Sequence, residues 1–265
     1  MRLHIYDANN YLRRAFESGR PVQQVVPLYS QGEPRVWVFD GKGALTARRA
    51  LYPDYKLKRD RETPTANGAY DFIRAVQNDL LPHCDPLNTV IRINGWEADD
   101  IIAYLANAYS GLMSEVCIWS NDGDFLTLEE LPNVKLMERP KLADIVTGAD
   151  VRLYKTLVGD SSDNIPGLKL FGDKAWASLT DNTKREWQAF LEGDDIAVNF
   201  LLATMKPAQS TWFLDSDNRE LMRTFWKVVG FLPVDPGLVN RETIRSRLNV
   251  EAYRETCKKY MWGVL

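Results

Sequence analysis

Residues 2–7 read RLHIYD, an alternation of apolar and polar side chains that stops at a carboxylate. This pattern predicts a β-strand over residues 2–6 with Asp7 at its carboxyl end. Residues 10–17 then show helical spacing. A strand, an acid and a helix in this order are typical of the opening of an α/β fold.

Further strands are expected where apolar runs recur along the chain. These runs lie at residues 35–39, 89–93, 116–119 and 134–137. Helical spacing over residues 97–109 separates the third strand from the fourth. Because strands alternate with helices, the sequence predicts an α/β fold with a mostly parallel central sheet flanked by helices.

Acidic residues follow these strands at regular places. They are Asp7 after the first strand, Asp40 after the second, Glu97, Asp99 and Asp100 at the start of the next helix, and Asp122 and Asp124 after the fourth strand. Each acid alone is equally well explained as a turn residue or a helix cap. Together they should gather at one edge of the sheet, where ligands bind in open α/β folds. Crowded carboxylates stay ionised only beside cations, and oxygen ligands favour Mg²⁺ or Mn²⁺.

Composition narrows the class of protein. Hydrophobic residues make up 45% of the 265-residue chain, which is enough for a full core. The three cysteines and two histidines show no metal-type spacing, which argues against a zinc site and a disulfide framework. No apolar run approaches the length of a membrane span and the charged start does not resemble a signal peptide, so we expect a cytoplasmic protein.

The stretch from residue 41 to residue 70 differs from its surroundings. It is basic and aromatic and lacks core periodicity, which predicts a partly mobile excursion from the sheet. Its tyrosines leave two interpretations open, stacking on nucleic-acid bases or anchoring of the loop on the core. The basic and aromatic residues are Arg48, Arg49, Tyr52, Tyr55, Lys56, Lys58, Arg59 and Arg61.

Five blocks stand in a recognisable order: DANN at 7–10 with RAF at 14–16, VFDGK at 38–42 with YPDYK at 52–56, GWEADD at 95–100, SNDGDF at 120–125 and GDSSDNIPG at 159–167. Together they resemble the 5′-3′ exonuclease and flap endonuclease family, and the resemblance covers roughly residues 1–180. It implies a single 5′ nuclease domain over residues 1–265 with a PIN-like core, in the stand-alone form that phages and some bacteria carry.

The resemblance also implies an internal organisation. Residues 1–147 would form the metal-binding α/β core, with a basic arch or gateway at about 41–90 that a single strand enters. Residues 148–180 would form a helix-hairpin-helix (H3TH) element that grips duplex backbone. Beyond the resemblance, the helical pattern from about residue 148 to the end predicts a helical C-terminal region over residues 181–265.

The reaction that the resemblance implies is hydrolysis of a phosphodiester with two or more Mg²⁺ ions, for which Mn²⁺ can substitute. Setting nine motif acids aside from the net charge of −3 leaves +6 on the rest of the chain, which suits an acidic metal site on a mildly basic body. The implied metal ligands, some of them through water, are Asp7, Asp40, Glu97, Asp99, Asp100, Asp122, Asp124, Asp160 and Asp163.

Basic side chains are expected to meet the DNA. Lys56 and Arg59 are the candidates for the scissile phosphate, and Arg14 on the first helix is a third catalytic candidate. The family also implies a K⁺ ion on hairpin carbonyls, which the replacement of a family glycine by Leu170 argues against. The DNA-binding candidates are Lys169, Gly172 and Lys174 in the hairpin and Arg49, Tyr52 and Tyr55 in the arch.

The function predicted is a monomeric, structure-dependent 5′ nuclease in DNA replication or repair, acting in the cytoplasm of a bacterial or phage-infected cell. Its partner would be DNA with a 5′ end, a flap or a single/double-strand junction, without a membrane partner. Two alternatives stay open: a non-catalytic DNA-junction binding protein, and ribonuclease H-like removal of RNA primers from RNA–DNA hybrids. The block at 159–167 argues against a bare PIN-type ribonuclease, and the basic stretch argues against a small-molecule phosphatase.

Overall fold

The computed structural model describes residues 1–58 and 64–262 of the chain. The chain forms two compact units. The first, the sheet unit, comprises Met1–Ala44, Asp60–Asp144 and Pro233–Leu265. The second, the helical unit, comprises Leu45–Arg59 and Ile145–Leu232.

The sheet unit is built on a six-stranded sheet in the order β5-β4-β1-β2-β3-β6. All neighbouring strands are parallel except β3 and β6, which are antiparallel. This confirms the predicted α/β fold with a mostly parallel sheet. The strands are β1 (Arg2–Asp7), β2 (Arg35–Phe39), β3 (Asn88–Arg92), β4 (Glu115–Trp119), β5 (Val134–Leu136) and β6 (Thr243–Arg245).

Strand β6 is a departure from the sequence prediction, which had only helices in this part of the chain. It has three residues and lies at the edge of the sheet, and its Ile244 is 64% exposed. A strand this short and exposed leaves no alternation of buried and exposed residues in the sequence, so its pairing with β3 decides its structure.

The strand order reverses beside β1, and this position is the topological switch point of the sheet. From β1 the chain continues through β2 to β3 on one side of the sheet, and β4 and β5 lie on the other side of β1. In open α/β sheets, ligands bind beyond the carboxyl ends of the strands at such a point. The topology therefore directs attention to the ends of β1 and β4.

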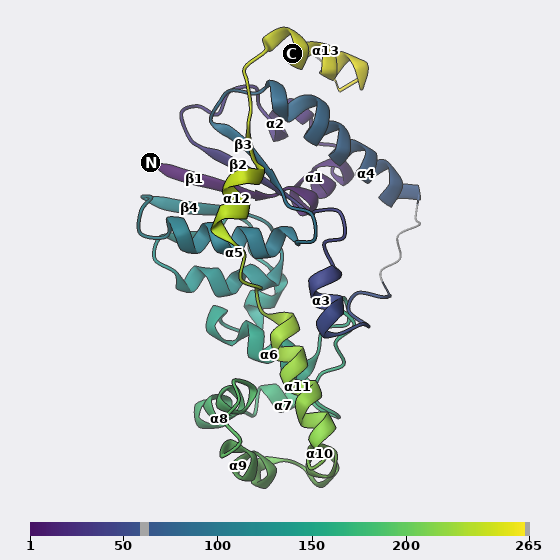
Figure 1. Cartoon of the computed structure of the whole chain (residues 1–265), viewed down its shortest axis with the longest axis vertical. Helices are drawn as coiled ribbons and strands as arrows, with labels where there is room; N and C mark the ends of the chain where they lie inside the picture. Colours follow the sequence, from purple (N-terminus) through teal and green to yellow (C-terminus); the bar gives the residue numbers. More distant parts are fainter. Residues whose placement is uncertain (59–63, 263–265) are drawn as a thin grey trace. The chain divides into compact units, whose positions relative to one another are not determined.

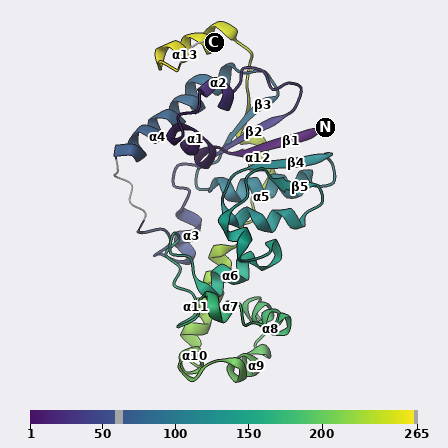
Figure 2. The same ribbon diagram turned by 180° about the vertical axis from the view of Figure 1, so that it is seen from behind.

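Helices cover both faces of the sheet (Figure 1). Helices α1, α2 and α4 lie over one face and α5 lies over the other, as the view from behind also shows (Figure 2). The helices of this unit are α1 (Ala8–Glu17), α2 (Val22–Val25), α4 (Pro64–Ala75), η1 (Val76–Leu80), η2 (Leu81–His83), α5 (Ala98–Tyr109), η3 (Gly123–Glu130), η4 (Lys141–Asp144), α12 (Pro236–Glu242) and α13 (Val250–Lys259).

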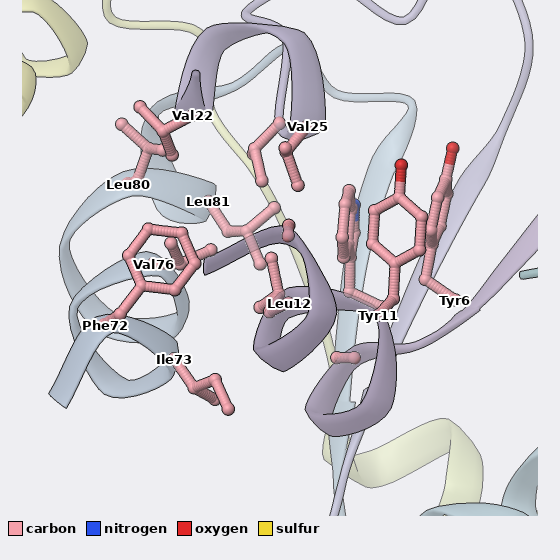
Figure 3. Packing of buried hydrophobic residues seen from close by; sticks show 14 of the residues in the cluster. Tyr6, Tyr11, Leu12, Val22, Val25, Phe72, Ile73, Val76, Leu80 and Leu81 are labelled. Atoms are coloured by element: carbon pink, nitrogen blue, oxygen red, sulfur yellow. The ribbon is translucent and has the colours of Figure 1, made fainter. Parts of the chain in front are cut away.

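The core under α1 holds the end of β1 in place. Figure 3 shows Tyr6 and Tyr11 beside the aliphatic side chains of α1, α2 and α4. Parallel register aligns Tyr6 with Trp37 on β2 and with Trp119 on β4. The Tyr6 ring stacks on both, with centroid distances of 4.1 Å to Trp37 and 5.5 Å to Trp119. This row of rings restrains the backbone one residue before Asp7.

The helical unit has its own aromatic core. Trp187, Phe190 and Phe213 pack edge to face, with ring centroids 5.0 to 6.0 Å apart. None of the helices in the described part of the chain combines the length and apolar character needed to cross a bilayer. The helices of this unit are α3 (Thr46–Leu51), η5 (Gly148–Asp150), α6 (Val151–Val158), α7 (Asp173–Trp176), α8 (Asp181–Leu191), α9 (Ala197–Thr204), α10 (Pro207–Phe213) and α11 (Ser216–Val229).

The predicted excursion at residues 41–70 is divided between the units. Helix α3 belongs to the helical unit, where the buried Arg48 donates to the carbonyls of Val228 and Gly230 at 3.0 and 3.1 Å. Helix α4 continues into the sheet unit's core through Phe72 (Figure 3). Arg48 and Phe72 are thus buried although the sequence shows no core periodicity here, because hydrogen bonds to carbonyls let an arginine be buried.

Candidate active site

Asp7 lies at the switch point and is only 5% exposed. It caps α1, accepting from the backbone N–H of Asn10 at 3.3 Å. Its other oxygen accepts from the hydroxyl of Ser120 at 2.9 Å. The Ser120 hydroxyl oxygen in turn accepts from the backbone N–H of Asp122 at 3.2 Å. The carboxyl ends of β1 and β4 are therefore joined through one buried serine.

Asp122 and Asp124 follow β4 at the start of η3. The Asp122 carboxylate caps this helix by accepting from the N–H of Asp124 at 3.0 Å. A carboxylate at a helix N-terminus faces the positive end of the helix dipole, which stabilises its ionised form. The position of Asp122 is therefore compatible both with a purely structural role as a helix cap and with the predicted role of a metal ligand.

Asp40 follows β2 and connects two further segments to this edge. Its Oδ1 accepts from the N–H of Ala98 at 2.9 Å, and its backbone N–H donates to Asn9 Oδ1 at 3.3 Å. A Cβ on the next residue, Gly41, would lie 1.8 Å from the Ile93 carbonyl oxygen. Only glycine allows the chain to pass this close after Asp40, so the Asp-Gly pair has a steric cause.

Three predicted ligands lie at the N-terminal end of α5. Glu97 precedes the helix and is 4% exposed, Asp100 is 1% exposed, and Asp99 is half-buried. Carboxylates at a helix N-terminus are stabilised by the dipole, which offsets part of the cost of burying them. Since Asp40 accepts from the N–H of Ala98, this turn lies at the same end of the sheet as Asp40.

The electrostatics of Asp7 show that acids converge here. Its pKa is raised to about 7, first by burial and then by the charge of Asp40, with Asp122 adding to the same direction. Hydrogen bonds from Ser120 and Asn10 lower it in part. Carboxylates from the ends of three different strands thus repel one another at one edge of the sheet. A divalent cation would relieve that repulsion.

These residues fit a hard cation that is held partly through water. Within residues 1–58 and 64–262, no three Asp, Glu, His or Cys side chains are placed to hold a metal ion. Mg²⁺ usually keeps several water ligands and is bound through one or two carboxylates. Oxygen donors from the ends of β1, β2 and β4 match that preference.

Arg14 lies on α1, seven residues after Asp7. Its Nε donates to Asn10 Oδ1 at 2.8 Å, and its Nη1 is paired with the carboxylate of Glu138. Glu138 follows β5, two residues after Leu136. The structure therefore places this predicted catalytic residue on the helix that Asp7 caps.

The fifth block lies in the helical unit, where a lysine accompanies each of its two acids. Asp160 pairs with Lys155 at 2.9 Å and accepts from Ser162, and Asp163 lies 3.6 Å from the Lys56 ammonium. Burial works to raise the pKa of Asp160, but Lys155 and the hydrogen bonds of Ser162 outweigh it and lower the pKa below its usual value. Both predicted ligands are thus largely neutralised within this unit.

Lys56 is placed differently from the sequence prediction of a side chain that meets phosphate. It is 6% exposed, and its backbone N–H and its ammonium both contact Asp163. In this arrangement the lysine contacts the loop that carries Asp163, and its role toward a phosphate stays a prediction. Its partner in the prediction, Arg59, lies outside the described residues.

The arch candidates also make contacts within the helical unit. Tyr55 is 3% exposed and donates to Asp163 at 3.4 Å, while Tyr52 packs edge-on against Phe225. Arg49 donates to the carbonyl of Tyr55 at 3.0 Å. For Tyr55 these contacts favour anchoring, because a buried ring has no free face for a base, whereas the half-buried Tyr52 leaves both interpretations open.

The hairpin between α6 and α7 presents its predicted DNA contacts to solvent. Lys169, Gly172 and Lys174 are exposed, and Leu170 is 72% exposed with φ at +56°. The residue that replaces a family glycine therefore still adopts the left-handed conformation that glycine favours. A groove of about 640 Å³ runs along residues 166–172 and is closed by Trp212, Asn218 and Leu221 on α10 and α11.

Sequence reasoning missed two residues of the sheet unit. Ser120 stands in the fourth block, two residues before Asp122, and its place at a strand end could have marked it. Glu138 belongs to none of the five blocks, and its partner Arg14 is 124 residues away in sequence. Only the pairing of β4 with β5 brings Glu138 to this edge of the sheet.

Comparison with known proteins identifies the family of the chain. Residues 2–154 match the family described as 5′-3′ exonuclease, N-terminal resolvase-like domain. The matched range contains every strand-end acid of the sheet unit discussed above. The chain therefore belongs to the 5′-3′ exonuclease family, a family of nucleases.

Individual relatives place the chain more closely. It is 28% identical over 222 residues to a 5′-3′ exonuclease of Aquifex aeolicus, covering 71% of this chain and 74% of the relative. It is 29% identical over 213 residues to DNA polymerase I of Caldicellulosiruptor bescii, covering 68% of this chain but only 24% of the relative. A flap endonuclease Xni of Shewanella pealeana is 30% identical over 161 residues, covering 54% of this chain and 56% of the relative.

A solved structure shows the same fold. The zinc-bound 5′-exonuclease of T5 superposes with a TM-score of 0.61 over 86% of this chain and 89% of its own, at 20% sequence identity. At this identity the likeness supports the fold, a mostly parallel sheet with flanking helices.

Proposed function

We propose that this protein is a structure-dependent 5′ nuclease that hydrolyses DNA phosphodiesters with bound divalent metal ions. The observation that carries the proposal is the convergence of Asp7, Asp40 and Asp122 at the switch point of the sheet. A substrate phosphate would add negative charge to an already crowded group of carboxylates. Such a site can bind phosphate only when cations are bound with it.

In the proposed mechanism the metal ions activate water and stabilise charge, and the side chains of the protein hold and orient the ions. Bound Mg²⁺ ions, two or more in the form we propose, would lower the pKa of a water and stabilise charge on the phosphate. Asp7 and Asp40 would hold the cation from the ends of adjacent strands. Ser120 keeps the Asp7 carboxylate in one orientation by donating to Oδ2. Buried Glu97 and Asp100 would add negative charge behind them.

The substrate class rests on the exposed hairpin and on the relatives. Exposed Lys169 and Lys174 can contact phosphates, and such contacts position a duplex without reading its sequence. A T5 flap endonuclease of similar fold, with a TM-score of 0.54 and 17% identity, was solved with DNA and metal ions. We therefore propose DNA with a 5′ end, a flap or a junction as the substrate, in DNA replication or repair.

Product analysis tests this proposal directly. The full chain is incubated with 5′-labelled flap, nicked and blunt duplex in Mg²⁺, in Mn²⁺ and in excess EDTA. We expect cleavage near the junction of the flap, loss of cleavage in EDTA, and none from an Asp122→Asn preparation purified in parallel. Full cleavage in chelator, with metal content measured as nil, would contradict the metal-dependent mechanism. A parallel flap with an RNA 5′ strand tests whether primer removal belongs to the activity.

A further inference from the structure

Three residues of the sheet unit lie in one line along α1. Asp7 caps the helix, Asn10 lies in its first turn and Arg14 follows one turn later. Residues three, four and seven positions apart share a helix face, so all three side chains lie on the same side of α1. The backbone of Arg14 lies about 10 Å beyond Asp7 along the helix axis, at 1.5 Å per residue, but its side chain reaches back to Asn10.

The guanidinium of Arg14 is held at two of its three nitrogens. Nε donates to Asn10 Oδ1 at 2.8 Å, and Nη1 is paired with Glu138. These two anchors fix the plane of the guanidinium, because its nitrogens form a rigid fork. The Glu138 carboxylate comes from the segment after β5, at the carboxyl end of the sheet.

The third nitrogen of Arg14 remains to be explained. Within the part of the chain that the structure describes, Nη2 is buried and has no hydrogen-bond partner. A buried donor without an acceptor costs free energy, so a native structure rarely keeps one without a ligand for it. The Arg14 side chain as a whole is 24% exposed, so part of it borders solvent although Nη2 itself is buried.

We propose that Glu138 and Asn10 are positioning residues that hold Arg14 toward a phosphate of the substrate strand near the cleavage site. The proposal rests on the nuclease function argued above. Because Arg14 Nε is hydrogen-bonded to Asn10, whose backbone N–H is hydrogen-bonded to Asp7, the guanidinium lies near the acid that would hold metal. An arginine fixed at two nitrogens loses little conformational entropy when its third nitrogen binds a phosphate. The guanidinium can therefore act as a specific phosphate-binding subsite.

A substrate series with one neutral phosphate at a time tests this inference. Single-turnover cleavage of 5′-flap DNA is measured with a methylphosphonate placed at successive positions beside the cleavage site. For the wild-type protein, neutralising the phosphate that Arg14 contacts should slow cleavage about tenfold, as expected for the loss of one charge-assisted hydrogen bond. Arg14→Ala should be slow on the natural strand and insensitive to methylphosphonate at that position.

Variants of Glu138 then separate positioning from a simple structural role. Glu138→Ala should raise KM more than it lowers kcat. Its cleavage rate should also become insensitive to a methylphosphonate at the same position as that of Arg14→Ala. Glu138→Gln should restore much of the profile, since its amide oxygen still accepts from Arg14. The matched control is Glu115→Gln, which removes a carboxylate from an ion pair with Lys135 at the other end of β4. It should leave the profile unchanged.

The proposal is overturned if Glu138→Ala keeps the wild-type profile, if Glu138→Gln is no better than Glu138→Ala, or if Arg14→Ala still responds at that position. Arg14→Lys is included as a second variant, with thermal unfolding to confirm its fold, and it should lose the same response. If the wild-type protein cuts none of the substrates, the nuclease proposal fails separately. Binding of the same methylphosphonate-substituted strands is then measured by fluorescence anisotropy in Ca²⁺. If Arg14→Ala shows the same dependence of affinity on methylphosphonate position as the wild type, Arg14 does not bind that phosphate and the proposal is overturned.

Discussion

The hydroxyl of Ser120 donates a 2.9 Å hydrogen bond to Oδ2 of Asp7, although the two residues are 113 positions apart in sequence. The same hydroxyl oxygen accepts from the backbone of Asp122 at 3.2 Å. One buried side chain thus orients the first acid of the site and connects it to the loop that carries another. The acids at this edge are positioned by a neutral residue as well as by their strands.

Replacing Ser120 with alanine should weaken the site without unfolding the sheet unit. The Asp7 carboxylate would lose a donor that lowers its pKa and fixes its orientation. We expect cleavage to fall about tenfold at limiting Mg²⁺ and to recover in part at saturating Mg²⁺. A metal titration of single-turnover rates measures this effect, with Ser120→Thr as the control that keeps the hydroxyl. An unchanged half-saturating Mg²⁺ concentration in Ser120→Ala would remove Ser120 from the site.

The raised pKa of Asp7 predicts how the metal-free protein responds to pH. A group whose folded pKa is raised, here to about 7, contributes stability below its unfolded pKa near 4 and loses it as the pH rises through 7. In EDTA, Asp7→Asn should therefore be more stable than the wild type at pH 8, by on the order of 3 kcal/mol, and nearly equal at pH 4. Thermal unfolding at both values measures the difference. Asp71→Asn, at an exposed position of α4, should show no such crossover.

The burial of Lys56 against Asp163 predicts a loss of stability in its alanine variant. Removing one partner of a buried pair leaves the other charge uncompensated, at a cost of about 3–5 kcal/mol. We expect Lys56→Ala to lower the urea midpoint of unfolding, whereas Lys58→Ala, two residues on and exposed, should not. If Lys56→Ala instead keeps full stability and slows cleavage on the order of 100-fold, the sequence prediction of a phosphate-facing lysine is the better one.

The role of the exposed hairpin lysines should appear in how DNA affinity depends on salt concentration. Lys169→Ala and Lys174→Ala are each expected to weaken binding to duplex-containing substrates regardless of sequence. Each should reduce the slope of log affinity against log salt by about one phosphate contact. Binding measured by anisotropy between low and moderate salt gives this slope. Arg185→Ala, on α8 of the same unit, serves as a surface control. Unchanged slopes in both lysine variants would place the duplex contact elsewhere.

Much of the sheet and its acids could be predicted from sequence. The pattern at 35–39 gave the observed bounds of β2, and the strand ending at Asp7 was placed correctly. Alternation of apolar side chains reports burial of one strand face, a local property. Because parallel strands end at one edge, an acid after each strand was enough to predict that Asp7, Asp40 and Asp122 would come together.

Other features were decided only by tertiary structure. The pairing of Arg14 with Glu138, the burial of Lys56 against Asp163 and the edge strand β6 all join segments far apart in the chain. A charged residue in a basic stretch looks the same in sequence whether it is exposed or paired with a distant carboxylate. The free energy that decides between these states comes from desolvation and from the partner across the fold, and neither is encoded in local periodicity. Sequence therefore determined where the acids of this nuclease fold would stand, and packing between distant segments determined which basic side chains remain available to a substrate.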